Sequence, residues 1–138
     1  IADIPGLIEG ANEGAGLGHR FLGHVERCKA LLHLIDVTSE KVEKDYLTII
    51  KELKAYNTDL AKKDQIVVLT KSDSASKQKI DDARKKLKKL KITDTIGISS
   101  VSGENISTLI RKLQDIISIN IKNEVIDDQQ HKVDSWSP

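Results

Sequence analysis

Two short apolar runs, at 30–37 and 65–69, constrain the fold of this chain more than any other feature. Each run is nearly continuous, which is typical of a strand that is buried on both faces of a parallel sheet. A third strand is predicted at about 95–99. Apolar residues at helical spacing lie between and around these strands. The alternation predicts an α/β fold, with three parallel strands and flanking helices.

The first of the predicted helices spans about 17–29. Thr38 or Ser39 is expected to cap the second helix, which ends near residue 57. The third helix, at 77–91, has its apolar residues on one face and is otherwise strongly basic. Each of these helices is long enough to cross over between neighbouring parallel strands.

The last helix is expected to run from about 106 to 121, where the apolar periodicity is lost. Residues 1–121 are therefore interpreted as the folded unit, and 122–138 as a loosely held polar tail. Aromatic residues make up only 3% of the chain, so the core must be built mostly from Ile, Leu and Val.

The composition excludes several classes of function. The net charge of +1 means that the chain as a whole is not a binder of polyanions, so such a role would need a local patch. No apolar run approaches the roughly 20 residues that span a bilayer. The single cysteine, Cys28, excludes an intramolecular disulfide. A reducing compartment, and hence the cytoplasm, is expected.

A polar loop, Thr70-Lys71-Ser72-Asp73, follows the second predicted strand. Ligands of parallel sheets bind at the carboxyl ends of the strands. At this place the carboxylate of Asp73 could accept two parallel N–H bonds from guanine, while the stem of Lys71 lies along the base. Adenine presents an acceptor at the same edge and would be rejected. In the alternative interpretation, Asp73 only caps the helix that follows.

The third predicted strand runs into a turn of small residues, Ser99-Ser100-Val101. Backbone N–H groups of this turn could bond the carbonyl of guanine, and the Ser99 hydroxyl could brace Asp73. Serine-rich strand exits are common, so this turn alone is weak evidence for a binding site.

A further motif, Asp3-Ile4-Pro5-Gly6, stands at the start of the chain, before glycines at 10, 14, 16 and 18. An Asp at the end of a strand can hold a metal through water, and a glycine N–H can reach a terminal phosphate. The glycine density is typical of a backbone that approaches a ligand closely and moves. Taken alone, the stretch could be a Pro-Gly turn with an incidental Asp.

The three motifs, in this order and spacing, resemble those of the translation-factor-related GTPases, and within them the Obg family. The resemblance covers about 1–120. It is carried by Asp3-Ile4-Pro5-Gly6-Leu7-Ile8-Glu9-Gly10-Ala11, Glu13-Gly14 and Gly16-Leu17-Gly18-His19, and also by Asp45-Tyr46-Leu47-Thr48-Ile49, Glu52-Leu53 and Tyr56-Asn57.

The resemblance implies a switch that binds GTP and GDP, hydrolyses GTP with Mg²⁺ and acts in assembly of the large ribosomal subunit, with that subunit or its rRNA as partner. It places Asp3 in the outer shell of Mg²⁺ and Gly6 at the γ-phosphate, and makes 7–18 a mobile switch. Leu7 stands where Ras-like GTPases carry a glutamine that orients water. Hydrolysis should therefore be slow or depend on another group.

The resemblance also assigns the loops 70–73 and 99–101 to nucleotide binding. Lys71 and Asp73 would read guanine, and Ser99 and Ser100 would close over the base. Thr70 stands where the family has Asn, so the base loses an amide contact and guanine affinity is expected to be weaker.

The sequence contains neither a G-x-x-x-x-G-K-[ST] phosphate loop nor a methionine. We therefore interpret the chain as the C-terminal part of the G domain of a longer protein. The chain alone is expected to be inactive, because the phosphate loop supplies most contacts to the β-phosphate. The strand at 30–37 would expose an edge, which predicts self-association.

Two other functions stay open. Because Thr70 breaks the guanine motif, the pocket could be degenerate or take an adenine nucleotide. The chain could also be a non-catalytic module that docks on RNA or the ribosome through the helix 77–91, although such a basic face is more often only solvated. The basic residues of this helix are Lys77, Lys79, Arg84, Lys85, Lys86, Lys88, Lys89 and Lys91.

Overall fold

The computed structural model describes Ile1 and residues 27–134, with side chains up to 123 except that of Tyr56. Most of the helix predicted at about 17–29 lies outside these residues. Its last residues, 27–29, are described and are not helical. The fold can therefore be compared with the prediction from the first strand onward.

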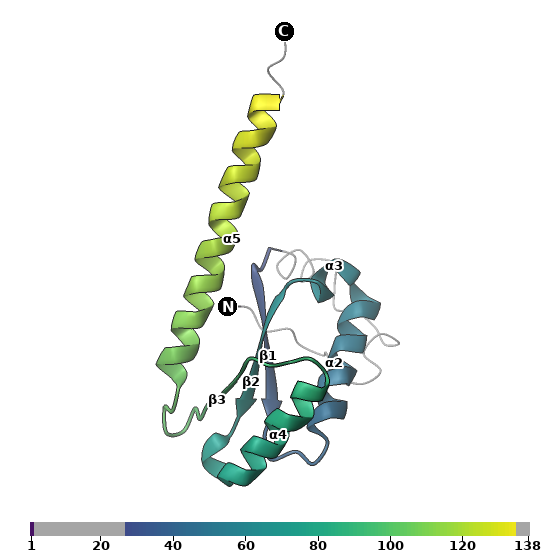
Figure 1. The fold of residues 1–138 in the computed structure, drawn as a ribbon, viewed down its shortest axis with the longest axis vertical. Coiled ribbons are helices and arrows are strands. Elements are labelled where there is room, and N and C mark those ends of the chain that lie inside the picture. Colours follow the sequence, from purple (N-terminus) through teal and green to yellow (C-terminus); the bar gives the residue numbers. More distant parts are fainter. Residues whose placement is uncertain (2–26, 135–138) are drawn as a thin grey trace.

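The described sheet has three parallel strands in the order β1–β2–β3 (Figure 1). β1 is Ala30–Asp36, β2 is Asp64–Thr70 and β3 is Thr95–Gly97. β1 and β2 pair along their whole length, so that Asp36 lies opposite Thr70. The predicted α/β architecture with three parallel strands is confirmed, although β3 ends two residues earlier than the expected 99.

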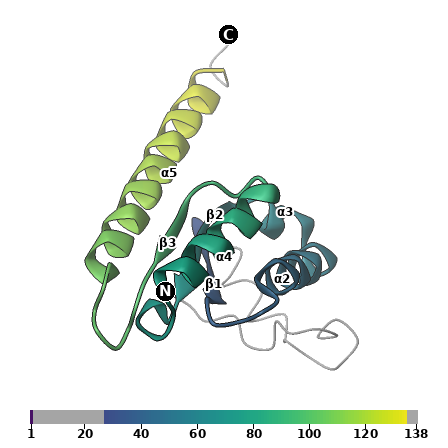
Figure 2. The ribbon, with the colours of Figure 1, turned by 60° about the horizontal axis from the view of Figure 1, so that its bottom comes forward.

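Helices cover both faces of this sheet (Figures 1 and 2). α2 (Val42–Tyr56) and α4 (Lys77–Lys89) pack on one face and α5 (Ile106–Asp134) on the other. Two short elements, α3 (Thr58–Ala61) and the 3₁₀ turn η2 (Ser72–Ser74), complete the described elements. The sheet is thus the middle of three layers.

The core is built on β2. Its residues Ile66, Val67, Val68 and Leu69 are all buried, alternately under α5 and under the α2–α4 layer. The prediction of a strand buried on both faces is confirmed for this strand. It is wrong for β1, where Leu34 is 56% exposed. The apolar cluster under α5 includes Leu32 of β1 but not Leu34.

The turn before α2 differs from the prediction. The residue at the N-cap is Lys41, not Thr38 or Ser39. The backbone N and the Oγ1 of Thr38 both donate to Oδ1 of Asp36, at 2.8 and 2.6 Å. Ser39 Oγ accepts from the backbone N of Lys41 at 3.1 Å and donates to Asp45 at 2.5 Å. Because the turn uses both hydroxyls, the helix begins only after it.

Several helix ends also differ from the prediction. α5 does not stop near 121 but continues to Asp134 (Figure 1), and 122–134 contain no glycine or proline that would break it. α3 was not predicted; the Asn57 side chain starts it by accepting from the backbone N of Asp59 and Leu60. α4 ends at Lys89, two residues earlier than expected.

The buried imidazole of His33 makes the stability of this fold depend on pH. His33 is 7% exposed and stacks on Tyr46, with ring centroids 4.9 Å apart. No hydrogen-bond partner for its Nδ1 lies within the described part of the chain. Burial disfavours the charged ring and lowers the pKa of His33 from 6.5 to about 4.

We expect the free energy of unfolding to fall by about 3 kcal/mol as the pH drops from 7 to 4, through His33 alone. The unfolded chain binds a proton at this residue below pH 6.5, whereas the folded chain does so only below about pH 4. The full contribution of neutral His33 to the free energy of unfolding is therefore present above pH 6.5 and is lost as the pH falls towards 4. Urea unfolding at both pH values measures it. In His33→Phe, which keeps a ring on Tyr46, the fall should be smaller by this amount; an equal fall would contradict the assignment.

Candidate functional site

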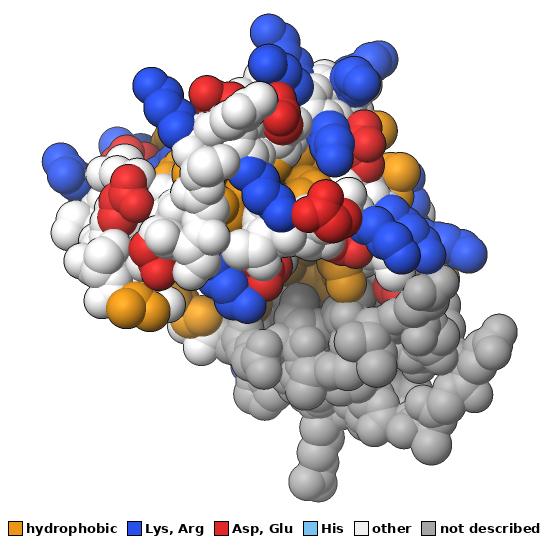
Figure 3. All heavy atoms as spheres, turned by 90° about the horizontal axis from the view of Figure 1, so that it is seen from below, with side chains coloured by type: hydrophobic (Ala, Val, Ile, Leu, Met, Phe, Trp, Pro, Cys, Tyr) orange, Lys and Arg blue, Asp and Glu red, His pale blue; other side chains and the backbone are white. Residues whose placement is uncertain are grey.

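The two polar loops predicted from the sequence lie side by side at the carboxyl ends of β2 and β3. The backbone N of Ile98 donates to the carbonyl of Leu69 at 2.8 Å, and the backbone N of Ser72 donates to the carbonyl of Ile98 at 3.0 Å. The hydrogen bonding of the sheet thus continues beyond β3 and joins the loop 70–73 to the loop 99–104. Figure 3 shows this end of the molecule, where side chains of both charges are interspersed.

Thr70 is the last residue of β2, and its side chain belongs to the sheet. Its Oγ1 donates to the carbonyl of Ile35 at 3.2 Å, and its own carbonyl accepts from the backbone N of Val37 at 3.1 Å. The hydroxyl therefore links β2 to β1. It does not replace the amide that an Asn would offer to a ligand here.

Lys71 forms an ion pair that connects the exits of β2 and β1. Its backbone is left-handed, with φ of 59°, and its Nζ lies 2.6 Å from Oδ2 of Asp36. This bond, followed by the one from Thr38, lowers the pKa of Asp36 to about 2. Asp36 thus holds Lys71 with one oxygen and Thr38 with the other.

The carboxylate of Asp73 is exposed, and serine hydroxyls near it lower its pKa. A hydrogen bond from Ser99 is the first cause that holds the pKa of Asp73 below its usual range, and Ser74 Oγ donates to Oδ2 at 3.2 Å. The predicted brace of Asp73 by Ser99 fits the direction of this pKa shift and stays a prediction. The alternative, that Asp73 caps the next helix, is wrong, because Ser76 Oγ accepts from the backbone N of Lys79 and caps α4. Asp73 is ionised at neutral pH and has two oxygens to accept hydrogen bonds.

The turn after β3 has a buried base and an exposed tip. Ser99 is completely buried, and its Oγ accepts from the backbone N of Ser102 at 3.1 Å. The carbonyl of Ser99 accepts from the backbone N of Gly103 at 2.9 Å, which closes the turn. Ser100 and Val101 lie at the exposed tip, where Val101 is 88% exposed.

Two acidic residues of this edge, Asp36 and Glu104, are not among the predicted site residues. Asp36 could have been predicted, because an acidic residue at the end of an apolar strand is a recognisable sequence pattern. Glu104 gave no signal; its Oε2 accepts from Ser72 Oγ at 2.8 Å, across 32 positions of the chain.

A groove of about 280 Å³ lies between the beginnings of α2 and α4. Its lining includes the ion pair of Glu40 with Lys79, at 2.7 Å, but no residue of 70–73 or 99–101. The candidate site is therefore the open surface at the strand ends rather than this groove.

The N-terminal part of the predicted site, Asp3-Ile4-Pro5-Gly6 with Leu7, lies outside the described residues. In the part of the chain that is described, no three His, Cys, Asp or Glu residues gather closely enough to hold a metal ion. Nor does any helix within this part have the length and apolar character needed to cross a membrane.

Comparison with protein families supports the nucleotide interpretation. The family model of the 50S ribosome-binding GTPases matches residues 1–71, which is just over half of the 138 residues. The match begins before the motif at 3–6, continues through β1, α2 and β2, and ends at Lys71. The chain belongs to the family of 50S ribosome-binding GTPases.

Proposed function

We propose that this chain is the base-reading part of a GTP-binding and GTP-hydrolysing switch, within a longer protein that supplies a phosphate loop. One observation carries the proposal. The exposed, ionised carboxylate of Asp73 lies where the exits of two parallel strands are joined by hydrogen bonds. Open α/β sheets bind their ligands at such exits.

The chemistry of guanine fits this carboxylate. Its ring N1–H and exocyclic amine are two adjacent donors, which match the two acceptor oxygens of Asp73. The backbone N–H groups of Ser100 and Val101 are proposed to bond the guanine carbonyl, since both residues are exposed at the tip of their turn. The aliphatic stem of Lys71, whose ammonium group is held by Asp36, is proposed to lie along the base.

The phosphate end of the site is assigned from the sequence motif and the family. Asp3 is proposed to hold Mg²⁺ through water, and Gly6 to contact the γ-phosphate, in a stretch that includes Ile4 and Pro5. Leu7 cannot orient a water molecule, so slow intrinsic hydrolysis is proposed.

Asp73→Asn, made in the longer protein, should shift nucleotide preference from guanine to xanthine. The amide can donate to the carbonyl that xanthine carries in place of the guanine amine, whereas guanine loses a charged acceptor. GDP affinity should fall about 100-fold or more, while XDP affinity rises. Competition binding with GDP, XDP and ADP measures both changes.

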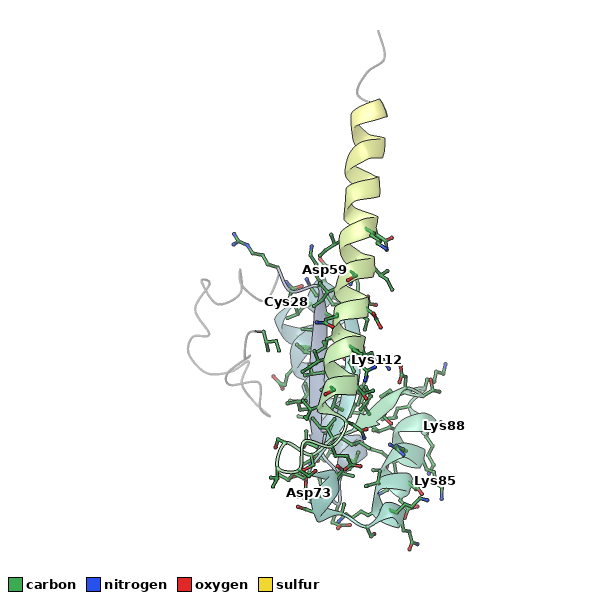
Figure 4. The ribbon with its side chains drawn as sticks, turned by 90° about the vertical axis from the view of Figure 1, so that its left-hand side faces the viewer. Cys28, Asp59, Asp73, Lys85, Lys88 and Lys112 are labelled. Carbon is green, nitrogen blue, oxygen red and sulfur yellow. The ribbon has the colours of Figure 1, made fainter. Side chains whose placement is uncertain are left out.

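Asp59→Asn is the matched control for this substitution. Asp59 is an exposed acid at the opposite end of the sheet from Asp73 (Figure 4), and among the described residues its carboxylate pairs with Lys62, three positions along. This variant should keep the preference for GDP. Unchanged guanine preference in Asp73→Asn would refute the role of Asp73, and a preference for ADP in the natural protein would favour an adenine pocket.

The 138-residue chain by itself should neither bind GDP tightly nor hydrolyse GTP. It contains no phosphate loop, and the base contacts alone leave the charge of the β-phosphate without a partner. Isothermal titration calorimetry with GDP tests this expectation. Sub-micromolar binding to the chain alone would overturn it.

A second candidate function is docking on ribosomal RNA through α4. From 83 to 91 the chain carries six basic residues and no acidic one. Ion pairs within α4 engage Arg84 and Lys85 with Asp81 and Asp82, at 3.8 and 3.5 Å, while Lys88 and Lys89 are exposed. Lys85 and Lys88 lie on a different side of the molecule from Asp73 in Figure 4.

Replacing Lys85 and Lys88 by Glu should weaken RNA binding and flatten its salt dependence, because each phosphate contact releases counterions. Filter binding of large-subunit rRNA to the 138-residue chain, over a range of salt concentrations, measures both effects. Arg111→Glu with Lys122→Glu makes the same change of charge on exposed positions of α5 and should have little effect. RNA binding that does not depend on salt, or an equal loss of RNA affinity in both double variants, would contradict this function.

The cellular setting follows from the family. We propose a role in assembly of the large ribosomal subunit, and therefore a cytoplasmic location, since the family is described as 50S ribosome-binding. Self-association through the edge of β1 stays a prediction. It is supported by the exposed Leu34 and by the pairing of β1 with β2 alone among the described strands.

A further inference from the structure

Glu104 contacts residues of both loops of the candidate site. Its Oε2 accepts from Ser72 Oγ at 2.8 Å, and its backbone carbonyl accepts from the backbone N of Ser99 at 3.2 Å. Ser72 directly precedes Asp73, and Ser99 is the first cause of the lowered pKa of Asp73. Glu104 therefore holds the two residues that determine where Asp73 lies.

Ser72 is buried, and both of its hydrogen-bond donors have partners. Ser72 is 8% exposed, its backbone N donates to Ile98, and its hydroxyl donates to Glu104. Ser72 opens the three-residue turn η2, of which Asp73 is the middle residue. A shift of Ser72 would therefore move the backbone that carries Asp73.

The Ser99 side is equally constrained. Ser99 Oγ accepts from the backbone N of Ser102 at 3.1 Å, which holds this buried hydroxyl in the turn. The turn that fixes Ser99 ends at Asn105, whose Nδ2 donates to the carbonyl of Gly97 at 2.8 Å. Gly103 and Asn105 are both left-handed, with φ of 78° and 57°, so the backbone bends on either side of Glu104.

We propose that Glu104 is a positioning residue for guanine recognition. It ties the Ser72 turn to the Ser99 turn, so that both oxygens of Asp73 face the N1–H and the exocyclic amine of guanine together. This inference rests on the proposed function of the site. Asp73 itself is exposed, so burial does not orient it, and its direction depends on the residues that Glu104 holds.

Inosine diphosphate separates positioning from general stability. Hypoxanthine lacks the exocyclic amine, so IDP makes only one of the two bonds to Asp73. Glu104→Ala in the longer protein should weaken GDP binding more than IDP binding. The ratio of GDP to IDP affinity should fall about tenfold, the size of one hydrogen bond to a charged group. Direct titration of both nucleotides measures the ratio.

Three further variants test the route through Ser72. Ser72→Ala should lower the ratio as Glu104→Ala does, and the double variant should lower it no further, because the two substitutions remove one contact. Glu104→Gln keeps an acceptor oxygen and should retain most of the ratio. It also keeps the test valid if Glu104→Ala folds poorly.

Asp94→Asn is the control, since it removes an exposed carboxylate that pairs with Lys112, outside both loops. Its GDP to IDP ratio should match that of the natural protein. Equal losses of GDP and IDP affinity in Glu104→Ala, or additive effects with Ser72→Ala, would overturn the positioning role and leave the proposed function intact. Absence of guanine-nucleotide binding by the natural longer protein would overturn both.

Discussion

The pairing of β2 with a strand on each side is the constraint on which the rest of the structure depends. Four consecutive side chains of β2, Ile66 to Leu69, are buried, and each contributes about 1.5–3 kcal/mol. The register with β1 sets Thr70 opposite Asp36, which brings Lys71 within reach of that carboxylate. On the other side, the bond from Ile98 to Leu69 places Ser72 beside the exit of β3. A single strand thus positions both sides of the candidate site.

Asp36, Glu104 and Asp73 are carboxylates at this edge of the described sheet, and their surroundings give them different roles. Asp36 is neutralised by Lys71 and holds Thr38. Glu104 accepts from Ser72 and acts within the protein. Asp73 forms no ion pair within the described residues and faces solvent, so it retains the charge and the acceptor capacity that a ligand with two donors needs.

The sequence predicted the parallel sheet because a strand buried on both faces must be almost wholly apolar, and 65–69 is such a strand. Exposure of Leu34 was not predictable, because it depends on where α5 lies across the sheet. Thr38 or Ser39 is expected as a cap because both residue types favour caps, but nearer acceptors, Asp36 and Asp45, engage their hydroxyls. Residues 122–134 are expected to form a tail because they lack apolar periodicity. They are nevertheless helical, since residues can favour a helix by their intrinsic propensity without a periodic apolar face.

In the candidate site, too, features that follow from local sequence patterns were predictable, whereas contacts between distant residues were not. Asp73 was predictable, since an acid at the end of a buried strand is a local pattern. That the loops of Asp73 and Ser99 adjoin follows from the expectation that neighbouring parallel strands end at one edge. The contact of Glu104 with Ser72 spans 32 positions and depends on the path of the turn, which no local pattern reveals.

A crystal structure of the longer protein bound to GDP tests the central claim most directly. We expect both carboxylate oxygens of Asp73 to lie within about 2.7–3.2 Å of the ring N1 and the exocyclic nitrogen of guanine, with the bond between Ser72 and Glu104 retained. A base bound in the groove between α2 and α4, or one that presents another edge to Asp73, would contradict the account.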